Sequence, residues 1–173
     1  MDKYYYLLSE IPHLIFGQES NITQRLFLAE AEKWLSEKDF IELIQLNINE
    51  FEEEQFNNSL LALYRSFEYQ LRSELAKYRR DKKEGREYKS YMFSPSIFKD
   101  SDPLNVEKEL LKLRWNFVEE NEAGHNFDLH AVMAYYLKLQ LNEKLYSWEK
   151  EKGRENFNSL VNINKNEDQG KVT

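Results

Sequence analysis

The chain has 173 residues, of which 41% are hydrophobic and 14% aromatic, which is enough for a buried core and argues against global disorder. Five glycines, three prolines and no cysteine argue against a turn-rich β-sandwich or barrel, and exclude disulfides, Cys-ligated metals and thiol nucleophiles. The net charge of −7 disfavours a nucleic-acid-binding surface over the whole molecule, because phosphate binding needs clustered cations.

The first sixteen residues, MDKYYYLLSEIPHLIF, are predicted to be an apolar segment buried against helices. Tyr and Ile favour a strand and Leu-Leu favours a helix, so both remain open, with helix preferred. Glu10 and Pro12 interrupt the apolar run, which is therefore unlike an export signal and too short for a membrane helix. We expect a cytoplasmic protein with no direct membrane insertion.

Two short helices are predicted next. Residues 17–23 read as a loop that ends at Thr23, a candidate N-cap, and Ser36 is the cap of a second helix with Asp39 as its capping-box partner. Apolar residues at steps of three and four predict the buried face of the first helix: Leu26, Phe27, Ala31, Trp34 and Leu35.

The clearest predicted element is a long helix over residues 50–84. Apolar residues with alternating spacings of four and three form a continuous seam: Phe56, Leu60, Tyr64, Phe67, Leu71, Leu75 and Tyr78. Acidic residues crowd its start and basic residues its end, which complements the helix dipole. About 30 residues would give a rod of roughly 45 Å, which we expect to protrude or to span two lobes.

The second half of the chain continues the helical pattern. Residues 85–102 read as an irregular linker, Asp102 and Pro103 start a helix that Gly124 ends, and Asp128 caps a second long helix over residues 128–152. A short helix over 154–161 and a disordered tail over 162–173 complete the chain. We therefore predict an all-α irregular bundle of about five to seven helices, with one domain over 1–161 or two lobes, 1–84 and 103–161.

Residues His125, Asp128 and His130 are the one candidate metal cluster. The spacing of Glu122 and His125 is similar to the Glu-x-x-His pair of helical di-metal proteins, but no second pair exists and Gly124 would end the helix that presents it. Loop packing and capping are therefore preferred over a metal site.

Charged residues near the apolar faces predict an ion pair rather than a catalytic site. Arg72, Glu74, Arg114 and Glu119 are candidates for a buried pair between the long helices. No phosphate loop, Ser-His-Asp order or dinucleotide fingerprint occurs. We expect no enzymatic activity, no cofactor and no small-molecule ligand, with an unrecognised helical enzyme as the lesser alternative.

The linker is the candidate partner-binding segment, through Tyr88, Tyr91, Met92 and Phe93. Aromatic residues and Met are enriched at interface centres, and irregular segments usually lie on the surface. Core packing under the two long helices is the preferred alternative. Electrostatic steering would come from the basic residues at the neighbouring helix end, Arg79, Arg80, Lys82 and Lys83. The alternative interpretation is that these residues only form a solvated helix terminus.

Several stretches of the chain carry a family resemblance. KYYYLLSEIPHLIFGQ, FLAEAEKWLSEKDFIEL, FEYQLRSELAKYR and HNFDLHAVMAYYLKLQLNEKLYSWEKEKG together resemble an uncharacterised bacterial family encoded within V/A-type ATP synthase operons. The matching residues near the start are Tyr4, Tyr5, Tyr6, Leu7, Ile11, Pro12, Phe27, Leu28, Leu35, Ser36 and Asp39.

The resemblance implies a non-catalytic V-type ATP synthase subunit or accessory protein, with other subunits of that complex as partners. A central-stalk adaptor is the form that we prefer, and a transient assembly factor or regulator is the alternative. The helical composition is similar in style to the larger C subunit, which seats the stalk on the membrane ring. The resemblance further implies a location peripheral to the inner membrane, through the complex.

Overall fold

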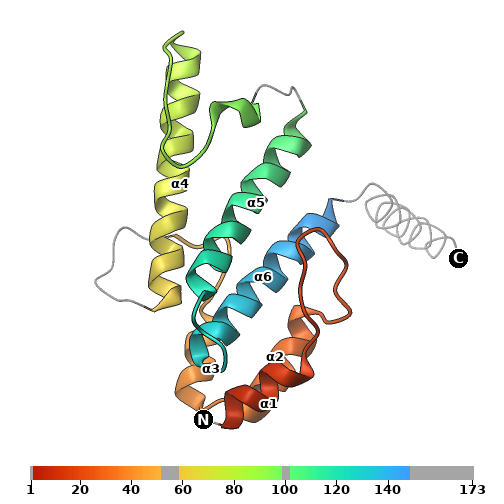
Figure 1. Ribbon diagram of the computed structural model, residues 1–173. Coiled ribbons are helices and arrows are strands. Elements are labelled where there is room, and N and C mark those ends of the chain that lie inside the picture. The colour runs from red at the N-terminus through yellow and green to blue at the C-terminus, as the bar shows by residue number, and fades with distance from the viewer. Residues whose placement is uncertain (1, 52–58, 99–101, 149–173) are drawn as a thin grey trace, which may run out of the picture.

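The computed structural model describes residues 2–51, 59–98 and 102–148, and these parts of the chain form helices joined by turns and loops (Figure 1). The prediction of an all-α irregular bundle is confirmed. The described elements are α1 (Asp2–Glu10), α2 (Gln24–Trp34), α3 (Glu37–Ile44), α4 (Leu60–Lys83), the short 3-10 helix η1 (Pro95–Phe98), α5 (Pro103–Glu122) and α6 (Leu129–Ser147).

Helix α6 lies at the centre of the bundle and packs against all five other α-helices. Every residue from Ala131 to Asn142 is buried, as is typical of a helix in the core of a globular protein. The polar residues of this stretch are satisfied, since Gln140 and Asn142 bond to backbone groups of neighbouring loops and Lys138 pairs with Glu122. These contacts fix the loops around α6.

Four helices begin at the N-caps that the sequence predicts, and α4 begins at a cap that it did not predict. Five capping side chains accept a hydrogen bond from a backbone N–H of the first turn: Thr23, Ser36, Ser59, Asp102 and Asp128. Four of these caps were predicted, and Gly124, with φ of +91°, follows the end of α5 as expected. Local capping chemistry therefore sets most of the helix starts.

The helix preferred for the first sixteen residues is found over Asp2–Glu10, as α1, whereas residues 11–16 are not helical. Leu7 is fully buried in the main core, and the carboxylate of Asp39 ties α3 to α1 by accepting hydrogen bonds from Lys3 at 2.5 Å and Tyr4 at 2.8 Å. Tyr5 and Tyr6 stay about half exposed. The three tyrosines therefore lie in different surroundings, since Tyr4 bonds to Asp39 while Tyr5 and Tyr6 face solvent in part.

The predicted helix over 50–84 is shorter than expected, because α4 begins at Leu60. The Asn47 side chain accepts from the Asn49 N–H, and the Glu50 N–H bonds to the Asn47 carbonyl, so a turn occupies this stretch. Residues 52–58 lie outside the described residues. The 24 residues of α4 give a length of roughly 36 Å.

The later boundaries also differ from those predicted. α6 ends at Ser147, with Trp148 as C-cap, before the predicted end at 152. The predicted helix over 154–161 and the predicted tail over 162–173 lie outside the described residues. α5, at 20 residues, is a third long helix beside α4 and α6. Leu26, which was expected on the buried face of α2, is 52% exposed.

Two separate hydrophobic clusters hold the bundle together. The main core surrounds α6 and receives residues from all six α-helices. A smaller group, which we call the upper cluster, joins the C-terminal half of α4 to η1 and the start of α5 through the buried residues Leu71, Leu75, Phe93 and Leu110. The C-terminal end of α4 projects beyond α5 and α6 (Figure 1). None of the described helices has both the length and the apolar character needed to cross a bilayer.

Candidate functional site

The projecting end of α4 and the segment that follows it form the candidate docking site, and we call residues 77–91 the tip. Gly85 adopts φ of +71°, a left-handed conformation that glycine accepts without strain. The Gly85 N–H bonds to the Lys82 carbonyl and the Arg86 N–H to the Asp81 carbonyl, at 3.3 and 2.9 Å. This pair of bonds is the Schellman motif, and it turns the chain back along α4 (Figure 1).

A buried carboxylate on α4 holds the returning segment. Glu74 is only 2% exposed and accepts hydrogen bonds from the Tyr88 hydroxyl at 2.5 Å, the Ser90 hydroxyl at 3.1 Å and Lys77 at 3.1 Å. Burial alone would raise the pKa of Glu74, but the bonds from Tyr88, Lys77 and Ser90 outweigh burial and lower it. The same bond raises the pKa of Tyr88 to about 12. We call Glu74, Tyr88 and Ser90 the latch.

The aromatic residues of the linker divide between the two interpretations that the sequence left open. Phe93 is 5% exposed and makes edge contacts with Tyr78 and Phe98 in the upper cluster, where Met92 also packs. Tyr91 is 78% exposed. Phe93 is therefore a core residue, whereas the docking role of Tyr91 stays a prediction.

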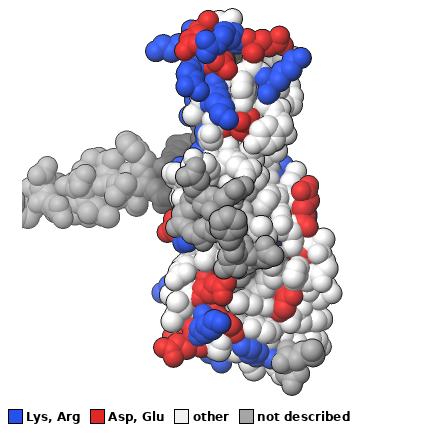
Figure 2. Space-filling model, turned by 90° about the vertical axis from the view of Figure 1, so that its left-hand side faces the viewer, with Lys and Arg blue, Asp and Glu red and all other residues white. Residues whose placement is uncertain are grey.

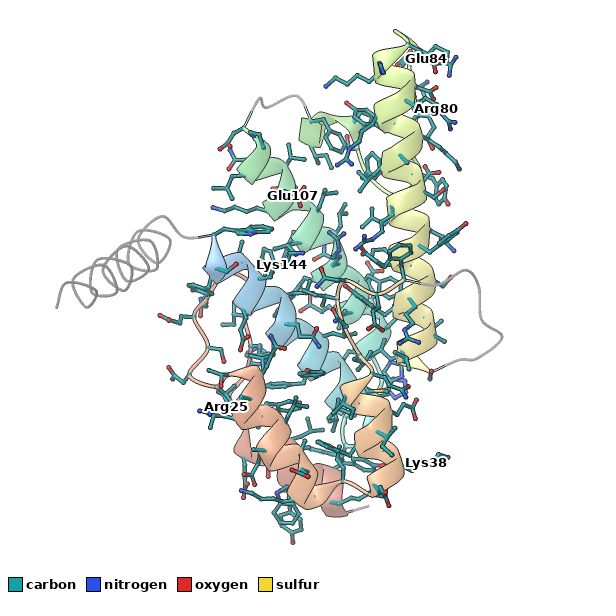
Figure 3. The ribbon with its side chains drawn as sticks, turned by 180° about the vertical axis from the view of Figure 1, so that it is seen from behind. Arg25, Lys38, Arg80, Glu84, Glu107 and Lys144 are labelled. Carbon is teal, nitrogen blue, oxygen red and sulfur yellow. The ribbon has the colours of Figure 1, made fainter. Side chains whose placement is uncertain are left out.

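The tip is more basic than the rest of the molecule. Residues 77–91 contain seven Lys and Arg against three Asp and Glu, in a chain whose net charge is −7. Arg86 binds both Asp81, at 2.6 Å, and Glu84. In the space-filling view, Lys and Arg gather at this end with Asp and Glu among them (Figure 2), and Arg80 and Glu84 lie on its outer side (Figure 3).

Five exposed cations of the tip have no carboxylate within ion-pair distance among the residues that the structure describes. They are Arg79, Arg80, Lys82, Lys83 and Lys89. Four of them are the basic residues that the sequence singled out. The structure places these four on the last turns of α4.

A buried ion network fixes α4 against α5 below the tip. Glu68 is fully buried and binds Arg114 of α5 through two bonds of 2.8 and 2.9 Å, and Arg72 of its own helix at 2.7 Å. Arg72 also donates to the Asn49 carbonyl at 3.2 Å. The predicted pair between the long helices exists, with Glu68 as the acid that the sequence did not single out.

The other two predicted candidates, Glu74 and Glu119, are placed elsewhere. Glu74 belongs to the latch, and Glu119 lies 3.9 Å from Lys138.

The residues of the histidine cluster pack against one another and cap α6. His125 bonds to the Asp128 carboxylate at 2.6 Å and stacks on His130 with ring centroids 3.8 Å apart, while Asp128 caps α6. Burial and the nearby His125 lower the pKa of His130. Glu122 pairs with Lys138 rather than completing a ligand set. The described residues contain no group of three or more side chains placed to hold a metal ion.

One surface feature escaped the sequence analysis. Four rings form a row at the end of the molecule opposite the tip, with neighbouring centroids 5.0, 5.8 and 5.2 Å apart: Phe127, Tyr5, Tyr6 and Trp34. A helical projection of α1 around the buried Leu7 could have found the two tyrosines, because residues one and two positions before a buried residue point away from it.

Comparison with known proteins gives one family match. Residues 92–168 are similar to a family described as a protein of unknown function (DUF2764). The match covers less than half of the chain and begins at Met92, just after the tip, so it includes α5 and α6. No curated protein and no solved structure shows a significant match.

Proposed function

We propose that the protein is a non-catalytic subunit or accessory protein of a V-type ATP synthase, acting as a central-stalk adaptor. The family resemblance of the sequence supports the choice of complex. The observation that carries the adaptor role is the tip, a projecting surface that the latch and the upper cluster hold in place. A docking element on a rigid body needs little ordering when it binds, which favours association.

The adaptor role calls for contacts with other subunits rather than chemistry. Two surfaces of the molecule present aromatic side chains. Tyr91 is exposed on the segment that follows α4, and the row from Phe127 to Trp34 lies at the end opposite the tip. Tyrosine, tryptophan and arginine are enriched among residues that dominate binding energy. Association with the complex would place the protein peripherally at the inner membrane.

Co-purification tests this proposal. An affinity tag on a catalytic subunit should recover the protein from native membranes together with the stalk subunits, at constant stoichiometry through a second separation step. An intact, ion-pumping complex that never contains the protein would contradict the claim that it is a subunit.

The charge of the tip favours one second candidate, a transient assembly factor or regulator. Transient interfaces are more polar than permanent ones, and exposed charges act mainly on association rates. Deletion of the gene should then lower the yield of the complex while the purified complex keeps its full composition. A complex that lacks a subunit after deletion would favour the adaptor instead.

A further inference from the structure

We propose that the turn between α5 and α6, residues 123–128, is an acid-sensitive switch that opens when the stacked imidazoles of His125 and His130 both carry a charge. Opening of the turn would move Phe127 away from the ring of Tyr5, and would so remodel the aromatic row at this end of the molecule. The proposal goes beyond the proposed function and does not depend on it.

The two imidazole rings lie face to face. Their centroids are 3.8 Å apart and their planes differ by 7°. Neutral rings can stack at this distance, but two imidazolium charges repel each other, and they do so more strongly at a partly buried site than in water. The stack of His125 on His130 therefore accommodates one proton more readily than two.

The two histidines would take up a proton in different surroundings. Nδ1 of His125 donates to the Asp128 carboxylate at 2.6 Å, so a charged His125 gains an ion pair. Nε2 of His130 is buried and has no hydrogen-bond partner among the described residues. A charged imidazole carries a proton on both nitrogens, so a charged His130 would place a buried N–H there without an acceptor. We therefore assign the opening to the second proton, at His130.

The groups around His130 oppose its charged form on balance. Burial and the nearby His125 lower the pKa of His130, and they outweigh the Asn121 backbone carbonyl and the carboxylates of Asp128 and Glu122, which act in the opposite direction. Among the described residues, Asp128 is the one carboxylate within ion-pair distance of either histidine.

The other elements at this turn do not supply a free carboxylate. Glu122, at the end of α5, pairs with Lys138 of α6, and α1 contributes the ring of Tyr5 against Phe127. Because the pKa of His130 in the folded protein lies below the ordinary value of 6.5, the open form binds more protons below that pH. Acid therefore favours the open form, and the folded turn is most stable above about pH 6.5.

Asp128 couples the charge of the stack to the structure of the turn. One of its carboxylate oxygens binds His125, and the other caps α6 by accepting from the Ala131 N–H at 2.9 Å. Phe127 lies between the two histidines in the chain, and its ring centroid is 5.0 Å from that of Tyr5. Repulsion within the stack would therefore act on the helix cap and on the aromatic row together.

Amide hydrogen exchange of the full chain at pH 7.5 and pH 5.0 tests the proposal, since both values lie above the range in which Asp39 takes up its proton. After correction for the intrinsic exchange rate at each pH, protection at the turn should fall about fivefold or more on acidification. The reporters are three amides whose hydrogen bonds define the turn and the start of α6: His125, Ala131 and Val132. The Phe27 amide, which bonds to the Thr23 carbonyl at the start of α2, should keep its protection within about twofold. An equal fall at Phe27 would overturn the proposal.

A pair of histidine variants separates the switch from a general effect of acid. His130→Phe removes the second proton site and keeps a ring in the stack, so it should abolish the fall in protection. His13→Gln removes an exposed histidine outside the turn and should show the parental fall. No fall in the parent, or the same fall in His130→Phe as in the parent, would overturn the proposal.

Proton NMR of the parent gives a second readout that requires no variant to fold. The imidazole signal of His130, identified by its contact with the His125 ring, should titrate with a midpoint below pH 6.5. The nuclear Overhauser effect between the rings of Phe127 and Tyr5 should weaken over the same range. A midpoint at or above pH 6.5, or an unchanged contact between these two rings at pH 5.0, would overturn the proposal.

Discussion

Glu68 illustrates how a single buried charge fixes two helices. Its carboxylate is fully buried and both oxygens accept bonds from Arg114, whose side chain is only 12% exposed. Removing one partner of such a pair leaves an unpaired buried charge, which costs more than the pair contributes.

We predict that Glu68→Leu lowers the free energy of unfolding by ~3–5 kcal/mol, because it leaves Arg114 buried without an acid. Adding Arg114→Met should recover at least half of that loss, since two apolar side chains can fill the same space. Urea denaturation of the parent, both single variants and the double variant measures this coupling. Simple additivity of the two single effects would show that the pair is not energetically coupled.

Asp39 links α1 to α3, and its carboxylate should make the free energy of unfolding depend on pH in the acidic range. Burial would raise the pKa of Asp39, but hydrogen bonds from Lys3, Ser36 and Tyr4 lower it from 3.8 to about 2. Because the folded-state pKa lies below the ordinary value, the carboxylate stabilises the fold above about pH 4. That contribution is lost as the pH falls from about 4 toward 2.

Asp39→Asn should therefore be less stable than the parent by about 1–2 kcal/mol at pH 6, with a difference that shrinks below pH 4. Denaturant titrations at pH 6, 4 and 3 measure the difference. Glu37→Gln, an exposed carboxylate in the same helix, is the control for a general effect of charge removal. A difference for Asp39→Asn that stays constant down to pH 3 would contradict the assignment.

At the scale of elements, the latch determines how the linker lies against α4. The hydrogen bond from Tyr88 to Glu74 is 2.5 Å long. It stabilises the protonated hydroxyl and the ionised carboxylate, since it raises the pKa of Tyr88 and contributes to the lowered pKa of Glu74. A bond to a buried carboxylate should hold the segment between Arg86 and Tyr91 in place, and its loss should open that segment locally.

We predict that Tyr88→Phe raises the rate of native-state trypsin cleavage after Arg86 and Lys89 about fivefold, corresponding to ~1 kcal/mol of lost local stability. Tyr91→Phe is the matched control, because the Tyr91 hydroxyl makes no hydrogen bond among the described residues. Limited proteolysis with mass spectrometry measures both. Similar cleavage rates for the two variants would show that the latch does not hold the linker.

The sequence predicted elements well where the signal is local. Thr23, Ser36 and Asp128 act as caps through bonds to residues three positions away, so their chemistry is readable from the chain. The seam of α4 from Leu60 onward was equally clear from spacing. Leu26 was misplaced because apolar periodicity does not tell which side of a helix its neighbours will cover.

The candidate site was only partly predictable for the same reason. The basic end of α4 and the aromatic linker could be read from composition. The separation of Tyr91 from Phe93 could not, because it depends on the path of the chain after Gly85. Glu74 meets Tyr88 and Ser90 at separations of 14 and 16 residues, and no local pattern encodes that pairing.

At the scale of the whole molecule, the two hydrophobic clusters differ in size and share α4 and α5. The main core surrounds the fully buried middle of α6, while the upper cluster has four buried residues and supports the tip. Adjacent residues of α5 point into different clusters, since Leu110 packs in the upper cluster and Leu111 in the main core. Segments with fewer buried contacts open at lower free energy than the core.

The pair Leu110→Ala and Leu111→Ala tests whether the tip can open without the main core. Both residues are at most 2% exposed, so each substitution should lower the stability of the cluster that holds the residue by ~2–5 kcal/mol. Leu110→Ala should speed amide hydrogen exchange in the tip and linker and leave the protected amides of α6 near their parental rates. Leu111→Ala should speed exchange in α6. Mass spectrometry resolves these segments, and equal acceleration of α6 by both variants would show that the two clusters unfold as one cooperative unit.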